Sequence, residues 1–221
     1  MREEMSQMPQ IPQMPRTLRS DARENRDRVL DAARALFAER GLDVTMREVA
    51  RRAGVGPATL YRRFPTRQSL VDEAFADELR ACAQIVDDAC ADPDPWRGFR
   101  AVVEELTVLN ARNRGFVDAF MSAHPHADAF VTHRAALLQR LARLGERAQA
   151  SGGLRGDYEL DDLLLILLAG RGLAATPVAD RPAAARRFAA LAVAALRTAD
   201  TNEVLPRAPR LNAHVVASPA V

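Results

Sequence analysis

The chain has 221 residues, 48% hydrophobic and 27% charged, the balance of a globular protein and not of a disordered chain. Aromatic residues make up only 5%, while Ala, Leu and Arg recur throughout, which favours helices and argues against an all-β fold. No uncharged apolar stretch reaches the roughly 18 to 20 residues of a spanning helix, so no membrane contact is expected. The first 15 residues hold acids and prolines without an apolar stretch, so no secretory signal is expected.

Basic charge is concentrated near the N-terminus. The net charge is +2, and all 31 basic residues are arginines. Residues 16–67 hold thirteen arginines and seven acids, a balance of +6, whereas residues 68–221 have a balance of −3. Clustered guanidinium groups attract phosphates and release their counterions, so this excess is typical of a nucleic-acid-binding module. Arginine-rich helices that are only solvated faces are the alternative.

The two cysteines give information about the compartment. Cys82 and Cys90 lie in one predicted helix, about 12 Å apart at a rise of 1.5 Å per residue. They are too far apart to form a disulfide with each other, which fits a reducing environment. We therefore expect a cytoplasmic protein.

Three short helices are predicted in the N-terminal quarter. Asp21 and Glu24 can cap a first helix, which ends at Gly41. A capping box, T-x-x-E at residues 45–48, opens a second helix, and a third begins with proline over residues 57–64.

A longer fourth helix is predicted from Thr66, because apolar residues keep the helical spacing of 3.6 over five turns. Its inner stripe is Val71, Phe75, Leu79, Cys82, Val86 and Ala89. The acidic, proline-containing stretch 92–95 ends this helix and is the best candidate for a domain boundary. Further helices are predicted over residues 96–112, 116–124, 128–150, 161–175 and 183–199. No strand or repeat is predicted, so the fold is expected to be all-α.

The stretch Thr45–Phe64, TMREVARRAGVGPATLYRRF, has the pattern of a helix-turn-helix. Ala50 is small where two helices cross, Gly54 allows a turn with positive φ, and Leu60 can fix the second helix onto the first. On that second helix Leu60 and Phe64 share the buried face. The exposed side is formed by Ala58, Thr59, Arg62 and Arg63. Arg62 can offer two hydrogen bonds to guanine.

The sequence TLYRRF, followed by PTR at residues 65–67 and by Leu70, closely resembles the TetR family of bacterial transcription regulators. The resemblance includes VL-x-AA-x-x-LF at residues 29–37 and Gly41, and helix order extends it loosely over the whole chain. It implies a three-helix DNA-binding bundle joined by a long helix to a C-terminal helical domain. It also implies a homodimer that binds double-stranded DNA at a palindromic operator and releases it when a small-molecule effector binds.

The resemblance implies roles for single residues. Positions that contact phosphate or face the groove in the family are occupied by Thr45, Thr59, Tyr61 and Arg67. This chain has Gly56 where many family members have Ser, Ala58 where many have Gly, and Arg63 where many have His. The predicted DNA-binding set is Thr45, Arg47, Gly56, Pro57, Ala58, Thr59, Tyr61, Arg62, Arg63 and Arg67.

The last two predicted helices suit a dimer interface. Residues 163–168 are apolar on every side and must be buried, and the alanine-rich final helix allows close packing across a two-fold axis. The alternative is a core within one subunit. The predicted dimer residues are Leu164, Leu167, Leu168, Phe188, Leu191 and Ala195.

The effector site is predicted among the helices between residues 96 and 171, where apolar side chains surround a few polar ones. The candidates are Trp96, Phe99, Val103, Leu106, Asn110, Phe120, Phe130, His133 and Arg171. Arg171 interrupts an apolar helix, and either an acid across the interface or an anionic effector could pair with it. No cofactor is expected. Effector binding is expected to shift the long helix and thereby the spacing of the recognition helices.

The predicted organisation has four parts: a disordered arm (1–20), a helix-turn-helix domain (21–67), a dimerisation and effector domain (68–200) and a disordered tail (201–221). One alternative function is metal sensing through His124, His126 and His133, near Asp128. Another is a helical interaction scaffold. An enzyme is not expected, because the sequence has no glycine-rich phosphate loop, no GxSxG and no Cys beside a His.

Overall fold

The computed structural model describes residues 16–112, 114–121, 128–199 and 203–211. These residues contain no β-strand, only an isolated bridge between Leu154 and Arg197, so the all-α prediction is confirmed. The helices are α1 (Arg16–Arg40), α2 (Met46–Ala53), α3 (Pro57–Arg63), α4 (Arg67–Ala74), α5 (Ala76–Ala91), α6 (Pro95–Arg112), α7 (Arg114–Met121), α8 (Asp128–Ala150), α9 (Leu160–Ala169), the 3-10 helix η1 (Gly170–Ala175) and α10 (Arg181–Leu196).

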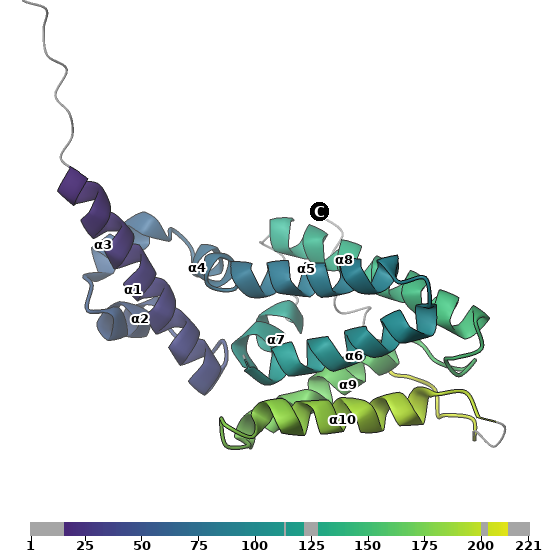
Figure 1. Ribbon diagram of the computed structural model, residues 1–221. Coiled ribbons are helices and arrows are strands. Elements are labelled where there is room, and N and C mark those ends of the chain that lie inside the picture. Colours follow the sequence, from purple (N-terminus) through teal and green to yellow (C-terminus); the bar gives the residue numbers. More distant parts are fainter. Residues whose placement is uncertain (1–15, 113, 122–127, 200–202, 212–221) are drawn as a thin grey trace, which may run out of the picture.

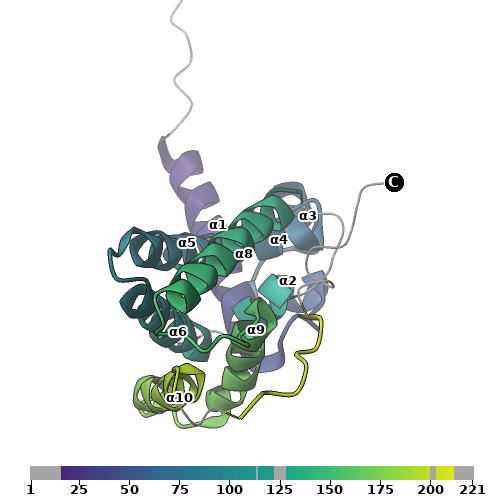
Figure 2. The same cartoon turned by 90° about the vertical axis from the view of Figure 1, so that its right-hand side faces the viewer.

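The helices form a small N-terminal unit at one end of a larger bundle. Figure 1 shows α1, α2 and α3 grouped together, with α4 leading from them into the bundle of α5 to α10. The central helix of the bundle is α6, which packs against α5, α8, α9 and α10 (Figure 2). Helix α1 belongs to both parts, because it packs against α2 and α4 and also against α7.

The first helix is longer than predicted. It begins at Arg16, so residues 16–20 of the expected disordered arm are helical. Asp21 and Glu24, expected to cap the helix, lie inside it instead. The physical reason is that no glycine or proline occurs between residues 16 and 40, so nothing stops the helix before Pro15.

The predicted long fourth helix is broken into α4 and α5 at Phe75, which corrects the expectation of one continuous helix. Phe75 has φ −107° and ψ 13° and is completely buried. Its ring centroid lies 5.7 Å from that of Phe37 on α1 and 6.0 Å from that of Phe116 on α7. The break therefore places an aromatic ring between the small unit and the bundle.

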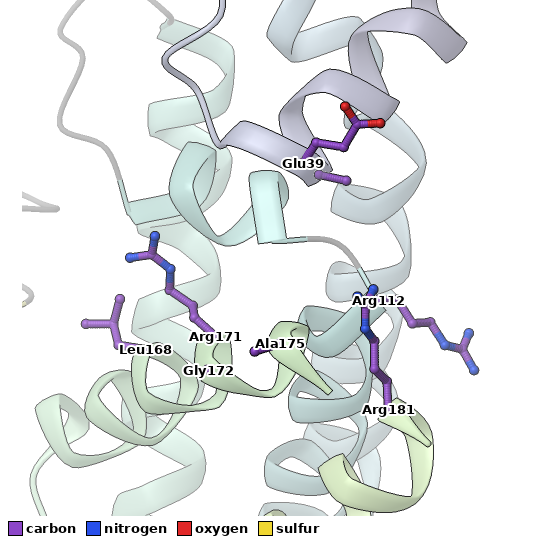
Figure 3. A pocket seen from close by; sticks show the side chains of 8 residues that line it. Glu39, Arg112, Leu168, Arg171, Gly172, Ala175 and Arg181 are labelled. Atoms are coloured by element: carbon purple, nitrogen blue, oxygen red, sulfur yellow. The ribbon is translucent and has the colours of Figure 1, made fainter. Parts of the chain in front are cut away.

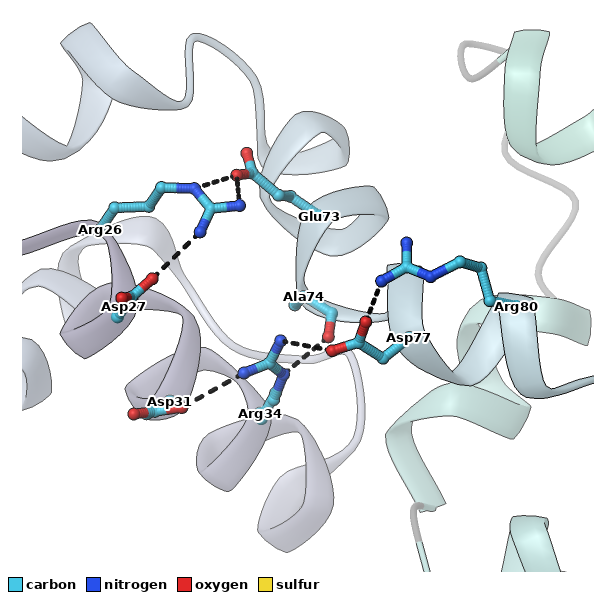
Figure 4. Close-up of polar contacts among 8 residues, drawn as sticks. All are labelled: Arg26, Asp27, Asp31, Arg34, Glu73, Ala74, Asp77 and Arg80. Carbon is cyan, nitrogen blue, oxygen red and sulfur yellow. Dashed lines mark hydrogen bonds and ion pairs between the residues drawn. The ribbon is translucent and has the colours of Figure 1, made fainter. Parts of the chain in front are cut away.

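Side chains of α1 hold this break in place (Figure 4). Arg34 donates from Nε to the carbonyl oxygen of Ala74 at 2.8 Å and also approaches Asp77 at 3.8 Å. Arg26 forms an ion pair with Glu73. Partly exposed ion pairs contribute little individually, so the buried aromatic contact is the larger source of stability here.

The stretch 92–95 forms the turn between α5 and α6 and the first residue of α6. Oδ1 of Asp94 accepts a hydrogen bond from the Trp96 N–H at 3.0 Å and so caps the start of α6. A Cβ added at Gly98 would lie 2.3 Å from the carbonyl oxygen of Ala89, so only glycine lets α6 approach α5 this closely.

Helix α8 has the predicted bounds 128–150, whereas several other helices differ from the predicted ranges. The expected helix 161–175 is α9 followed by η1, and α10 starts earlier than predicted, with a proline in its first turn. Part of the expected disordered tail, residues 203–211, is held against the bundle. There the Leu205 N–H donates to Oδ2 of Asp157 at 2.9 Å, and Arg155 pairs with the same carboxylate at 2.5 Å.

Candidate DNA-binding surface and effector cavity

The turn between α2 and α3 is made by a glycine in the left-handed region, as predicted. Gly54 has φ 66° and ψ 32°, and its N–H donates to the carbonyl oxygens of Ala50 and Arg51. A Cβ at this position would meet no atom within 4 Å, so the requirement for glycine is conformational and not steric.

The predicted capping box of α2 is confirmed. The Glu48 N–H donates to Oγ1 of Thr45 at 3.3 Å, and the Thr45 N–H donates to Oε2 of Glu48 at 2.8 Å. Arg40 adds a charged hydrogen bond to Glu48 at 2.7 Å. These bonds, that from the Thr45 N–H foremost, lower the pKa of Glu48 from 4.5 to about 2. The start of α2 is therefore fixed to the end of α1.

Helix α3 presents the two sides that its sequence predicts. Leu60 and Phe64 are completely buried, while Tyr61 is 47% exposed. The other exposed members of the predicted DNA-binding set on α3 and at its start are Gly56, Pro57, Ala58, Arg62 and Arg63. Thr59 is half-buried. The N-cap Gly56 makes no side-chain hydrogen bond, as expected for a residue without a side chain.

The arginines of the small unit divide into two groups. The first group is paired with acids: Arg26 with Glu73, Arg34 with Asp77, Arg40 with Glu48 and Arg52 with Glu39. Among the described residues, the structure records no ion pair for the exposed Arg47, Arg51, Arg62 and Arg63. The outward face of α2 and α3 therefore carries uncompensated positive charge, which is suited to phosphate.

Two predicted phosphate contacts lie at the edges of this face. Thr45 is exposed, although its hydroxyl also donates to Glu48 at 2.8 Å. Arg67 is half-buried, and its Nε donates to the Val44 carbonyl oxygen at 3.4 Å. Arg67 thus links the start of α4 to the residues before α2.

A narrow cavity of about 30 Å³ lies inside the bundle. Of the predicted effector residues, Leu106, Asn110 and Phe120 line it. Phe116 of α7 also lines it, and the described lining residues that were not predicted for this site are Cys82, Val117, Leu137, Leu138, Leu141, Leu164 and Leu167. The leucines of α8 could not be predicted for this site, because their spacing in the sequence is that of any buried helix face.

Other predicted effector residues lie elsewhere. Phe99 is buried between Trp96 and Tyr158, with ring centroids 6.0 and 5.2 Å away, and Val103 is fully buried. These residues are core and do not line the cavity. His133 is exposed on α8. The side chain of the remaining candidate, Phe130, lies outside the described residues.

The cavity is connected to α1 by a row of aromatic rings. Phe120 and Phe116, both lining the cavity from α7, have centroids 6.0 Å apart, and the row continues through Phe75 to Phe37. On the same helix, a Cβ at Gly115 would lie 2.7 to 2.9 Å from atoms of Phe37. Movement of α7 therefore acts directly on α1.

A second, wider cavity of about 560 Å³ opens at the junction of the two parts (Figure 3). It is lined by Ala38, Glu39, Arg112, Leu168, Arg171, Gly172, Ala175 and Arg181. In the view of Figure 3, the guanidinium group of Arg171 lies apart from those of Arg112 and Arg181. Arg171 forms an ion pair with Asp118 of α7 in the same chain, an acid that sequence reasoning did not identify.

Residues predicted for the dimer interface separate into two groups. Leu164 and Leu167 are buried and line the cavity within one protomer, which corrects their expected place at the interface. Leu191 is 56% exposed, Ala195 is exposed, and Leu168 and Phe188 are half-buried. The misplacement arises because α9 is apolar on all sides, so its sequence does not reveal which side faces inward.

The metal-sensing alternative rests on residues of which only His133 has a described side chain; His124 and His126 lie outside the described residues. In the described part of the chain, no group of three or more His, Cys, Asp or Glu residues is arranged to hold a metal ion. None of the described helices is long and apolar enough to cross a membrane.

Comparisons with known proteins agree with this architecture. Residues 29–74 match the family described as "Bacterial regulatory proteins, tetR family", and residues 94–198 match "Transcriptional regulator SbtR-like, C-terminal domain". The HTH-type transcriptional repressor KstR of Mycobacterium tuberculosis is 34% identical over 133 residues, which are 59% of this chain and 60% of that repressor. The chain thus spans less than two thirds of this curated relative.

Two solved structures extend the comparison. The TetR transcriptional regulator SCO0520 of Streptomyces coelicolor is 31% identical, over 78% of this chain and 98% of that one, with a TM-score of 0.46. The ketosteroid regulator KstR2 of Mycobacterium tuberculosis is 18% identical, over 79% and 95%, with a TM-score of 0.60, and shares the fold. These proteins are regulators and not enzymes. Because the two family models together match residues 29–74 and 94–198, the chain belongs to the TetR family of bacterial regulatory proteins.

Proposed function

We propose that this protein is a transcriptional repressor that binds a palindromic DNA operator as a homodimer and is released by a small-molecule effector. The observation that carries the proposal is the division of the arginines. On α2 and α3, the exposed Arg47, Arg51, Arg62 and Arg63 have no recorded acidic partner among the described residues, whereas the other group, Arg26, Arg34, Arg40 and Arg52, is paired with acids. The named repressor function of its relative KstR supports the same conclusion.

The recognition helix is α3. Its buried side fixes it on α2 through Leu60, so the helix places the exposed Arg62 at the surface, where it can reach a guanine edge. Tyr61 and Arg63 flank it, and Thr45 and Arg67 at the edges of the surface position the backbone of the DNA.

The dimer forms through the exposed side of α9 and α10. Leu165 and Leu191 are 39% and 56% exposed, and Ala195 beside them is small enough for helices of two protomers to approach closely. Single exposed leucines are common on protein surfaces, but Leu165 lies one turn from the half-buried Leu168 on α9, and Leu191 lies one turn from the half-buried Phe188 on α10.

The effector binds in the cavity inside the bundle and acts through α7. At about 30 Å³ the cavity has space for little more than ordered water, so a larger molecule must push its walls apart. Phe116 and Phe120 form the α7 wall, and Phe116 contacts α1 through Phe75 and Phe37. An expanded cavity therefore displaces the DNA-binding unit and changes the distance between the two recognition helices of the dimer.

Three arginine variants test the DNA-binding proposal. The operator is selected from a library of random duplexes, and affinities for it and for a scrambled duplex are measured by fluorescence anisotropy. Arg62→Ala should reduce the preference for operator about 5- to 150-fold, because a base contact is lost. Arg67→Ala should weaken binding to both duplexes by the same factor, because it removes only a phosphate contact.

The matched control is Arg52→Ala, because Arg52 is exposed on the same helix-turn-helix but is paired with Glu39 at 2.9 Å. It should leave both affinities nearly unchanged. If Arg62→Ala and Arg52→Ala behave alike, α3 does not read the operator. Equal weak binding of both duplexes by the unmodified protein would instead favour a helical interaction scaffold.

A further inference from the structure

The cavity inside the bundle contains one strongly polar side chain, Asn110 on α6. Apart from Asn110 and the thiol of Cys82, the described lining residues are all Leu, Val or Phe. Asn110 is only 7% exposed. An amide offers two donors and one acceptor, so its presence on an apolar wall requires an explanation.

Within the described part of the chain, the structure records no hydrogen-bond partner for the Asn110 side chain. Its buried neighbour Thr107 differs, because that hydroxyl donates to the Val103 carbonyl oxygen on the same helix at 2.6 Å. The Asn110 amide therefore faces the space of the cavity and has no structural role that the contacts reveal.

We propose that Asn110 is the polar recognition point of this cavity, and that the effector is a neutral, largely apolar small molecule that presents one hydroxyl or carbonyl oxygen to the Asn110 amide. Because this cavity is the effector site proposed above, the assignment rests on that proposed function. A single well-placed polar group in an apolar pocket fixes the orientation of a ligand and rejects analogues that lack the matching atom.

The absence of charge among the described lining residues favours a neutral ligand. None of the described residues that line the cavity is charged. The buried Arg134 of α8 lies one helical turn before Leu138, but it is not among the lining residues and donates to the Phe120 carbonyl oxygen at 2.9 Å. A carboxylate or phosphate inside the cavity would lose its water without gaining an opposite charge, which is strongly unfavourable.

The test uses the full-length protein and the variant Asn110→Leu, which keeps the size of the side chain and removes its polarity. In the absence of ligand, this variant should melt within about 2 °C of the unmodified protein, because the substitution removes no recorded hydrogen bond and keeps the size of the side chain. A larger decrease in melting temperature would show that Asn110 has a structural partner and would overturn the assignment.

Binding is measured by calorimetry with three matched probes: benzene, phenol and benzoate. The unmodified protein should bind phenol about 3- to 10-fold more tightly than benzene, the gain from one added hydrogen bond, and should bind benzoate most weakly. Asn110→Leu should lose the preference for phenol while still binding benzene. Leu106→Met, a conservative change in the same wall, should retain the preference.

Three results would overturn the assignment: a phenol preference that persists in Asn110→Leu, benzoate as the tightest probe, or no binding of any probe. Calorimetry without DNA separates this inference from the proposed function. If the unmodified protein prefers phenol but binds no selected operator, the repressor proposal fails and the cavity assignment stands. If it binds operator and shows no phenol preference, the cavity assignment fails and the repressor proposal stands.

Discussion

Replacing Gly115 by alanine tests the contact through which α7 is expected to move the DNA-binding unit. A Cβ at this position would lie 2.7 Å from Cβ of Phe37 and 2.8 Å from its carbonyl oxygen. Ordinary van der Waals contacts begin at 3.4 Å. Since the carbonyl belongs to the backbone of α1 and cannot rotate away, α1 and α7 must separate by roughly half an ångström.

The magnitude follows from two opposing effects. Overpacking of this kind costs about 1 to 3 kcal/mol, and the better helix propensity of alanine returns up to about 1 kcal/mol. A net loss of about 1 to 2 kcal/mol should lower the melting temperature of the Gly115→Ala variant by about 2 to 8 °C. If the strain is relieved by displacing the DNA-binding unit, operator affinity should fall about 5- to 30-fold without any effector.

Two other glycines provide matched controls. A Cβ at Gly156 meets no atom within 4 Å, so Gly156→Ala should change neither stability nor affinity appreciably. Gly98→Ala places its Cβ 2.3 Å from the Ala89 carbonyl oxygen inside the bundle, so it should lower stability while preserving operator affinity. The reasoning is refuted if Gly115→Ala behaves like Gly156→Ala, or if Gly98→Ala weakens operator binding as strongly.

Three further outcomes are expected. The pKa of Glu48 is lowered from 4.5 to about 2, and that of Asp157 from 3.8 to about 2, so the unfolded chain takes up these protons at higher pH than the folded one. The stability that these groups contribute is therefore fully present above about pH 4.5 and is lost as the pH falls toward 2. Denaturation by urea at a series of pH values measures it, and a free energy of unfolding that stays constant over this range would contradict the expectation. Burial raises the pKa of Cys82 to about 12. In native protein at pH 8, the variant Cys90→Ser, which keeps only Cys82, should therefore react with iodoacetamide far more slowly than Cys82→Ser, which keeps only Cys90. Equal rates would count against the buried position of Cys82. Leu191→Asp on the exposed side of α10 should shift the mass in sedimentation from dimer to monomer with little change in melting temperature, whereas an unchanged dimer would place the interface elsewhere.

Features set by local chemistry were predictable from the sequence. The capping box of Thr45 and Glu48, the left-handed Gly54 and the buried Leu60 each depend on residues within a few positions of one another. The all-α fold follows from helical spacing along the whole chain. The outward side of α3 follows in turn, because the buried residues determine which side chains remain exposed.

Features that depend on distant residues were not predictable. The break at Phe75 leaves the apolar stripe intact, and its cause is contact with Phe37 and Phe116, which come from other helices. Asp118 as the partner of Arg171 joins residues far apart in sequence. The assignment of Leu164 to a dimer interface was wrong for a related reason: an apolar helix indicates burial without indicating against what.

The most direct test of the account is the affinity of the unmodified protein for its selected operator and for a scrambled duplex, across a series of salt concentrations. If Arg47, Arg51, Arg63 and Arg67 of two protomers contact phosphate, log Kd should change with log salt with a slope of about 7 in magnitude. Operator should be bound at least about 1000-fold more tightly than scrambled DNA, with a palindrome as the selected sequence. Equal affinity for both duplexes, or a slope near zero, would contradict the account.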